Sequence, residues 1–243
     1  MPEGARPSLR PRTRQPDRYG ALLSLILIDC VVIFTSTEKG TSRWLPAVMV
    51  AITVLVGLGT SQVSGWWVNP TRVLAGLLIV ASAIDAFVGT DLSLAWIAVA
   101  QAVLLGILVV AIIGRLFTHS RVTAQTVLAV LCIYVVFGLI FALFAYGLSG
   151  ITGNQFFVQN PDPTLADFVY FSFVVLTTLG FGDLTPANNS GKAMVSFEAL
   201  LGQIFLVTVV SRLVSLYTKA SPPQGSEVPP EGPPETSGAP PAE

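Results

Sequence analysis

The hydrophobic residues of this chain fall in long blocks and do not alternate with polar residues. Six blocks each approach the roughly 20 residues that a helix needs to cross a bilayer: about 19–36, 44–60, 73–90, 92–117, 124–149 and 191–217. A seventh, at about 165–177, is too short to cross and must turn back. The pattern predicts an all-α membrane protein of six transmembrane helices, with a re-entrant helix between the fifth and the sixth.

The composition supports a membrane protein and excludes a soluble one. The chain is 52% hydrophobic and only 11% charged, with a mean hydropathy of +0.71, whereas soluble domains carry about 25% charged residues. Residues 1–18 are rich in arginine and residues 219–243 in Pro and Glu. We expect both segments to be disordered, because such compositions cannot bury a core. Cys30 and Cys132 lie inside apolar blocks, where a thiol is expected to pack as a small apolar group.

The basic residues predict the orientation of the helices in the membrane. Cytoplasmic loops carry the excess of Lys and Arg, and a cytoplasmic N-terminus leaves only Lys39, Arg43 and Lys192 outside. The other ten of the 13 basic residues then lie inside. With six crossings both termini are cytoplasmic, and the loop at about 150–190 faces outward.

The re-entrant segment, residues 165–183, contains the chemistry of interest. Asp167 lies near its start, where a carboxylate suits a helix N-terminus. Gly180 and Gly182 at alternate positions allow backbone angles that other residues avoid, so that successive carbonyl oxygens can point to one side. Four chains around an axis would form rings of carbonyls, with the hydroxyl of Thr178, that replace the hydration shell of a cation.

Thr177-Thr178-Leu179-Gly180-Phe181-Gly182-Asp183 resembles the selectivity filter of potassium channels, usually T-V-G-Y-G-D. Leu179 stands in place of Val and Phe181 in place of Tyr. The resemblance implies a filter made of Thr178, Leu179, Gly180, Phe181 and Gly182, in which K⁺ is bound through Thr178, Leu179, Gly180 and Phe181. It also implies a homotetramer, since one strand cannot enclose an ion.

Four further residues are candidates for supporting this filter: Thr177, Asp183, Tyr170 and Glu198. Tyr170 falls where the family often has a tryptophan, so it is a candidate hydrogen-bond partner for Asp183. Val174 occupies the place of a carboxylate that pairs with the filter aspartate in some members. Glu198, an ionisable residue inside a crossing segment, is a functional candidate; it could support the pore helix from behind the filter or act as a protonatable gate element.

Gly202, in the middle of the last segment, has two open interpretations. It resembles the hinge glycine of the inner helix in these channels, and it could equally allow close helix packing. Beyond it, Phe205, Val209 and Leu213 could line a constriction that closes by excluding water.

The first four segments resemble the sensor domain of voltage-gated-type cation channels. Voltage sensing needs several arginines in the fourth helix, and only Arg115, at the inner end, is present. We therefore expect weak or no voltage dependence. The resemblance divides the chain into a basic tail (1–18), a four-helix sensor-like domain (19–122), a pore domain (123–218) and a Pro/Glu-rich tail (219–243). Asp29 and Asp85 could bind a proton or cation, or cap polar groups.

Together these features favour a potassium-selective channel subunit of the plasma membrane. We expect it to form a homotetramer in the lipid bilayer, to conduct K⁺ passively, and to need neither a cofactor nor a nucleic-acid partner. The alternatives are a non-selective cation channel and a non-conducting modulatory or scaffold subunit. An enzyme is not expected, because the segments lack a metal-binding His pair, a Ser–His pair or a carboxylate cluster with catalytic spacing.

Overall fold

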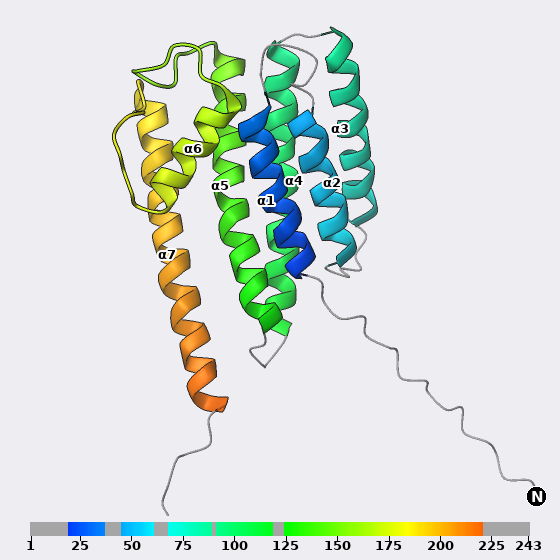
Figure 1. The fold of residues 1–243 in the computed structure, drawn as a ribbon, viewed down its shortest axis with the longest axis vertical. Helices are drawn as coiled ribbons and strands as arrows, with labels where there is room; N and C mark the ends of the chain where they lie inside the picture. The colour runs from blue at the N-terminus through cyan, green and yellow to red at the C-terminus, as the bar shows by residue number, and fades with distance from the viewer. Residues whose placement is uncertain (1–18, 37–44, 61–67, 89–90, 119–123, 221–243) are drawn as a thin grey trace, which may run out of the picture.

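A computed structural model describes residues 19–36, 45–60, 68–88, 91–118 and 124–220 (Figure 1). These residues form seven α-helices and no strand apart from one isolated bridge. The helices are α1 (Tyr19–Thr35), α2 (Leu45–Thr60), α3 (Val68–Val88), α4 (Asp91–Thr118), α5 (Ala124–Thr152), α6 (Leu165–Leu176) and α7 (Asn189–Ala220). Both tails lie outside the described residues, as does the side chain of Asp85.

The helices coincide with the seven apolar blocks of the sequence, so the prediction of their positions and of an all-helical chain is confirmed. Three are long and apolar enough to cross a membrane, at Ser93–Gly114, Gln125–Thr152 and Asn189–Ser211. The four shorter apolar helices are Tyr19–Thr35, Leu45–Gly59, Asn69–Ile84 and Leu165–Leu176. Pro46 and Pro70 stand in the first turns of α2 and α3, where a missing N–H breaks no helical hydrogen bond.

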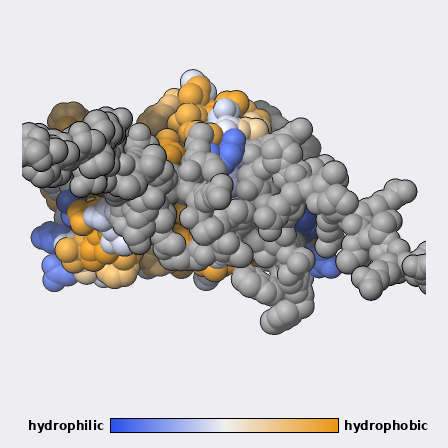
Figure 2. All heavy atoms as spheres, turned by 90° about the horizontal axis from the view of Figure 1, so that it is seen from below, coloured by the Kyte–Doolittle hydropathy of each residue, from blue (hydrophilic) through white to orange (hydrophobic). Residues whose placement is uncertain are grey.

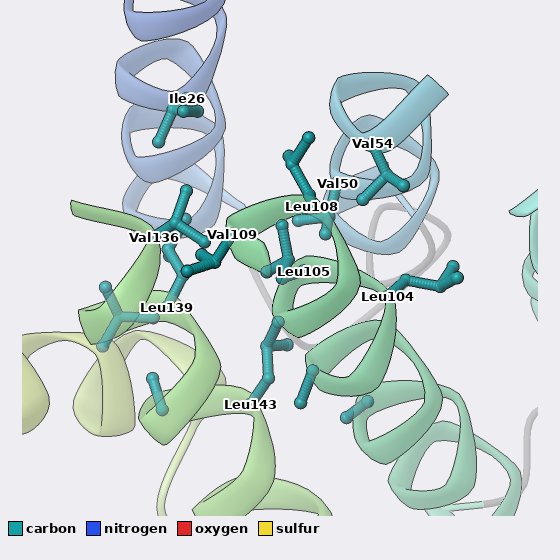
Figure 3. Close-up of a cluster of buried hydrophobic side chains, with 14 of the residues drawn as sticks. Ile26, Val50, Val54, Leu104, Leu105, Leu108, Val109, Val136, Leu139 and Leu143 are labelled. Carbon is teal, nitrogen blue, oxygen red and sulfur yellow. The ribbon is translucent and has the colours of Figure 1, made fainter. Parts of the chain in front are cut away.

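Helices α1 and α4 pack against α5, and α2 packs against α1 and α4. Figure 3 shows side chains from these four helices converging, among them Ile26, Val50, Leu105 and Leu139, and each is almost fully buried. One polar pair lies within the bundle, where Thr53 Oγ1 donates to Asp29 Oδ2 at 2.5 Å. α3 packs against α2 and α4, on the far side of the bundle from α6 and α7 (Figure 1).

The packing of α4 against α5 depends on small residues. A Cβ atom on Gly147 would lie 2.5 Å from Val99 Cγ2 and 2.7 Å from the carbonyl oxygen of Ala95. One on Gly150 would lie 2.7 Å from Ala95 Cβ. Because these distances are shorter than van der Waals contact, the two helices approach as closely as they do only with glycine at both positions.

α5 also contacts the two helices that follow it, α6 and α7. α6 packs on α5 and on α7 and lies between them in the upper half of the molecule (Figure 1). α7 extends below α6, and many of its apolar side chains are exposed in the single chain: Phe197, Leu200, Ile204, Leu206, Val207, Val210 and Val214. Figure 2 views the molecule from below. Among the described residues visible in that view, hydrophobic residues make up much of the surface. Such a surface suits contact with lipid or with other subunits.

We predict that Gly147→Ala destabilises the protein by about 1–3 kcal/mol, because the added methyl group meets the α4 backbone, which cannot move aside cheaply. Thermal unfolding of the purified protein in detergent measures the change. Gly106→Ala is the matched control, since Gly106 lies on α4 with open space around it; there alanine should stabilise the helix by up to about 1 kcal/mol. Equal effects of the two substitutions would contradict the packing argument.

Candidate functional site

The start of α6 is defined by a reciprocal set of capping hydrogen bonds. The backbone N–H of Asp167 donates to Thr164 Oγ1 (3.2 Å), and the Thr164 N–H donates to Asp167 Oδ2 (2.8 Å). Asn160 Nδ2 donates to the same carboxylate oxygen at 3.1 Å. Asp167 therefore lies at the helix N-terminus, as its position in the sequence indicated, and the capping box prevents α6 from starting elsewhere.

The chain leaves α6 in an alternating backbone conformation. Thr178, Gly180 and Gly182 have φ angles of 58°, 56° and 78°, while the residues between them do not have positive φ. This alternation lets successive carbonyl groups face the same side of the chain. Thr178 is the only described residue other than glycine with positive φ; such a conformation is costly and is typical of ligand-binding segments.

The end of α6 holds this segment by backbone hydrogen bonds. The N–H groups of Thr177 and Thr178 donate to Phe173 O and Val175 O, each at 2.9 Å. The N–H groups of Leu179 and Gly180 both donate to Val174 O, at 2.9 and 3.3 Å. The inner part of the segment is thus bonded directly to the last turn of α6. Its N–H groups point toward α6, away from the opposite side of the segment, which we call the open side.

The outer part of the segment is attached to α6 and to the loop before it. Tyr170 Oη donates to Asp183 Oδ2 at 2.7 Å, the pair expected from the sequence. This hydrogen bond raises the pKa of the Tyr170 phenol. Beyond Asp183, the Thr185 N–H donates to Gln159 Oε1 (2.9 Å) and Gln159 Nε2 donates to Thr185 Oγ1 (2.8 Å).

Behind the segment, one hydroxyl group joins three helices. Ser172 on α6 lies within hydrogen-bond distance of the carbonyl oxygen of Gly138 on α5 (2.8 Å) and bonds the carboxyl group of Glu198 on α7. Both Ser172 and Glu198 are nearly fully buried. The expected contact of Glu198 with α6 is therefore present; its two proposed roles, as a support behind the filter and as a protonatable gate element, both stay predictions.

Gly202 lies against the end of α6. A Cβ atom there would be 2.5 Å from Leu176 Cδ1, and α7 runs through this position as one continuous helix. The close-packing interpretation is therefore borne out, while the hinge stays a prediction.

Phe205 is one of three residues that could line a constriction, and the sequence left open which face of α7 points inward. Its ring stacks on Tyr134 (centroids 6.2 Å apart) and meets Phe137 edge-on (5.2 Å), so it faces α5. The exposed face of α7 carries other apolar residues, including Ile204 and Val207. Periodicity alone could not distinguish the two faces, because α7 is apolar on both. The side chain of Leu213 lies outside the description.

The residues of this site that the sequence analysis did not single out include Tyr134, Gly138 and Ser172. Tyr134 and Ser172 are polar residues within long apolar segments, and a buried hydroxyl group needs a partner. That signal could have identified both as contacts between elements. Gly138 gave no such signal; it admits the ring of Phe173, which a Cβ atom would approach to 2.7 Å.

Comparison with known proteins supports a channel. Residues 129–219, which include α6, the following segment and all but one residue of α7, match the family model described as "Ion channel". The two pore potassium channel c of Oryza sativa subsp. japonica is 35% identical over 79 residues, which cover 30% of this chain. The chain spans only 17% of the length of that relative. Together with the long apolar helices, the family match indicates a membrane protein with an ion-channel domain over residues 129–219.

We predict that Ser172→Ala lowers the stability of the protein by about 1–3 kcal/mol, because it leaves two buried groups, the Gly138 carbonyl and the Glu198 carboxyl, without this partner. Thermal unfolding in detergent measures the loss. In the control, Ser196→Ala on the exposed side of α7, we expect a change within about 0.5 kcal/mol.

A double variant sharpens this test. Combining Ser172→Ala with Glu198→Leu should cost less than the sum of the two single changes, since no buried carboxyl then remains without its partner. A Ser172→Ala protein as stable as the unmodified one would show that the three-helix contact contributes nothing.

Proposed function

We propose that this chain is one subunit of a potassium-selective channel that conducts K⁺ passively through a tetrameric pore. Thr178–Gly182 would form the filter, with the carbonyl groups of Thr178, Leu179, Gly180 and Phe181 binding K⁺. Thr177, Asp183, Tyr170 and Glu198 would support it, and Gly202 would mark the hinge of the inner helix. K⁺ is the permeant ion, and no cofactor takes part.

The observation that carries this proposal is the backbone of residues 178–182. A short apolar helix ends, and the chain continues with positive φ at every second residue. Its N–H groups at 179 and 180 bond back to the helix, which leaves the carbonyl oxygens of the segment available. A row of unpaired carbonyls is what a dehydrated cation requires in place of water.

Exposure of the segment supports assembly of four copies. Leu179 and Phe181 are 58% and 63% exposed in the single chain, beside the exposed apolar face of α7. One strand covers only one side of an ion, and such apolar surfaces are unfavourable in contact with water. A homotetramer would bring four such segments around one axis and cover these surfaces.

The proposed arrangement in the membrane rests on the six long apolar blocks of the sequence, three of which contain helices long and apolar enough to cross a membrane. α3, α4, α5 and α7 have 21 to 32 residues, and α1 and α2 have 17 and 16, about 24 to 26 Å at 1.5 Å per residue. We propose six crossings of the plasma membrane, with α6 as the re-entrant helix and both termini cytoplasmic. The outer loop would then be the one that carries Gln159 and Thr185.

Two alternative functions, a non-selective cation channel and a non-conducting scaffold subunit, would give different results in the experiment below. Phe181 lacks the phenol that the family usually has at this position, and Leu179 replaces a β-branched residue, so a less rigid filter could pass Na⁺ as well. A scaffold subunit would not conduct at all.

We predict a reversal potential close to the potassium equilibrium potential when the purified protein is placed in a planar bilayer with K⁺ on one side and Na⁺ on the other. The reason is that carbonyl rings replace the hydration shell of K⁺ better than that of Na⁺. Clear current that reverses near zero would support the non-selective channel instead. Protein that inserts as a tetramer and carries no current under any voltage or pH would support the scaffold.

We also predict shallow voltage dependence, with less than about one elementary gating charge per subunit, because moving one charge through 100 mV yields only about 2.3 kcal/mol and the α4 segment has Arg115 as its only basic residue. The slope of open probability against voltage in symmetric K⁺ measures this. Arg115→Gln should reduce the slope further or leave it unchanged. A slope that corresponds to several charges per subunit would show that another element senses voltage.

A further inference from the structure

The last turn of α6 has four carbonyl groups that the helix itself cannot satisfy, and their partners can be followed one by one. Three of them, those of Phe173, Val174 and Val175, accept hydrogen bonds from the N–H groups of residues 177–180. The fourth belongs to Leu176, two residues before Thr178. It accepts its hydrogen bond from a different helix, because Tyr134 Oη on α5 donates to Leu176 O at 2.9 Å.

This hydrogen bond holds the Leu176 carbonyl toward α5. Without it, the carbonyl would be an unpaired acceptor in an apolar layer, at the point where the chain begins to present carbonyl groups to its open side. It could then rotate toward the open side and change the geometry of Thr177 and Thr178. The phenol of Tyr134 therefore decides where the row of open carbonyls begins.

Both parts of Leu176 are held in place. Its side chain packs against Gly202 of α7, while its carbonyl is bonded to Tyr134. The ring of Tyr134 in turn stacks on Phe205 of α7, one turn beyond Gly202. α7 thus contacts Leu176 directly and also contacts the residue that holds its carbonyl.

We propose that Tyr134 is a positioning residue for the inner end of the ion-binding segment. It acts through the Leu176 carbonyl and fixes the backbone of Thr177 and Thr178 for K⁺. This inference rests on the proposed function, because it takes residues 178–182 as the K⁺ site. It assigns to α5 a direct part in K⁺ binding.

The test compares how K⁺ stabilises the full-length chain and two variants. A ligand that binds only the folded protein raises the unfolding temperature, so the midpoint is measured as K⁺ replaces Na⁺ at constant ionic strength. Tyr134→Phe removes one hydroxyl group and keeps the ring. We expect the K⁺ concentration that gives half of the rise to increase about fivefold, the effect of losing one typical hydrogen bond.

Phe137→Leu is the matched control. It disturbs the neighbouring aromatic contact, that of Phe137 with Phe205, and leaves the hydroxyl of Tyr134 in place, so the half-effect concentration should stay as in the unmodified chain. As a second measurement, the reversal potential should show a lower preference for K⁺ over Na⁺ in Tyr134→Phe and an unchanged preference in Phe137→Leu.

An unchanged half-effect concentration and reversal potential in Tyr134→Phe would overturn the proposal. So would equal changes in Phe137→Leu, because aromatic packing and not the carbonyl would then be responsible. If the unmodified protein itself were stabilised equally by K⁺ and Na⁺, the filter would be disproved first, and this inference with it; that result is distinct from a failure of Tyr134 alone.

Discussion

The structure around α6 depends on one constraint, which is that a helix ending inside an apolar layer leaves carbonyl groups that need partners. In this chain the segment that follows the helix supplies three of the partners by folding back on its last turn, and α5 supplies the fourth through Tyr134. Satisfying the helix end uses the N–H groups of the segment. The same step leaves the carbonyl groups of the segment free, and this is the property a cation site requires.

The elements around α6 are placed by close contact at small residues more than by polar pairs. Gly138 admits Phe173, Gly202 admits Leu176, and Gly147 admits Ala95 and Val99. Between helices in a membrane, water drives little association, so close packing and a few buried hydrogen bonds must supply the stability. The Ser172 contact adds such a bond where α5, α6 and α7 meet, and it joins all three through one side chain.

The sequence predicted the features that are local along the chain. Long apolar blocks gave every described helix within a few residues, and the glycine pattern of residues 178–183 indicated the unusual backbone. The Tyr170–Asp183 bond was also foreseen, because those two residues belong to one motif. Contacts between distant segments were harder. Tyr134 is 42 residues from Leu176, and nothing in an apolar helix says which neighbour a phenol will meet. For the same reason, the sequence did not indicate that Phe205 faces α5.

The arrangement of α5 changes what the first four helices are expected to do. Here only residues 119–123 separate α4 from α5, and the two helices pack closely over glycine residues that leave no space between them. The α4 segment also lacks the charges that a field could act on. Since α5 contacts both Ser172 and the Leu176 carbonyl, a bundle packed on α5 stabilises α6 and the segment that follows it. In the part of the chain that the structure describes, α1 and α4 pack against α5, and α7 is the least buried of the three long apolar helices.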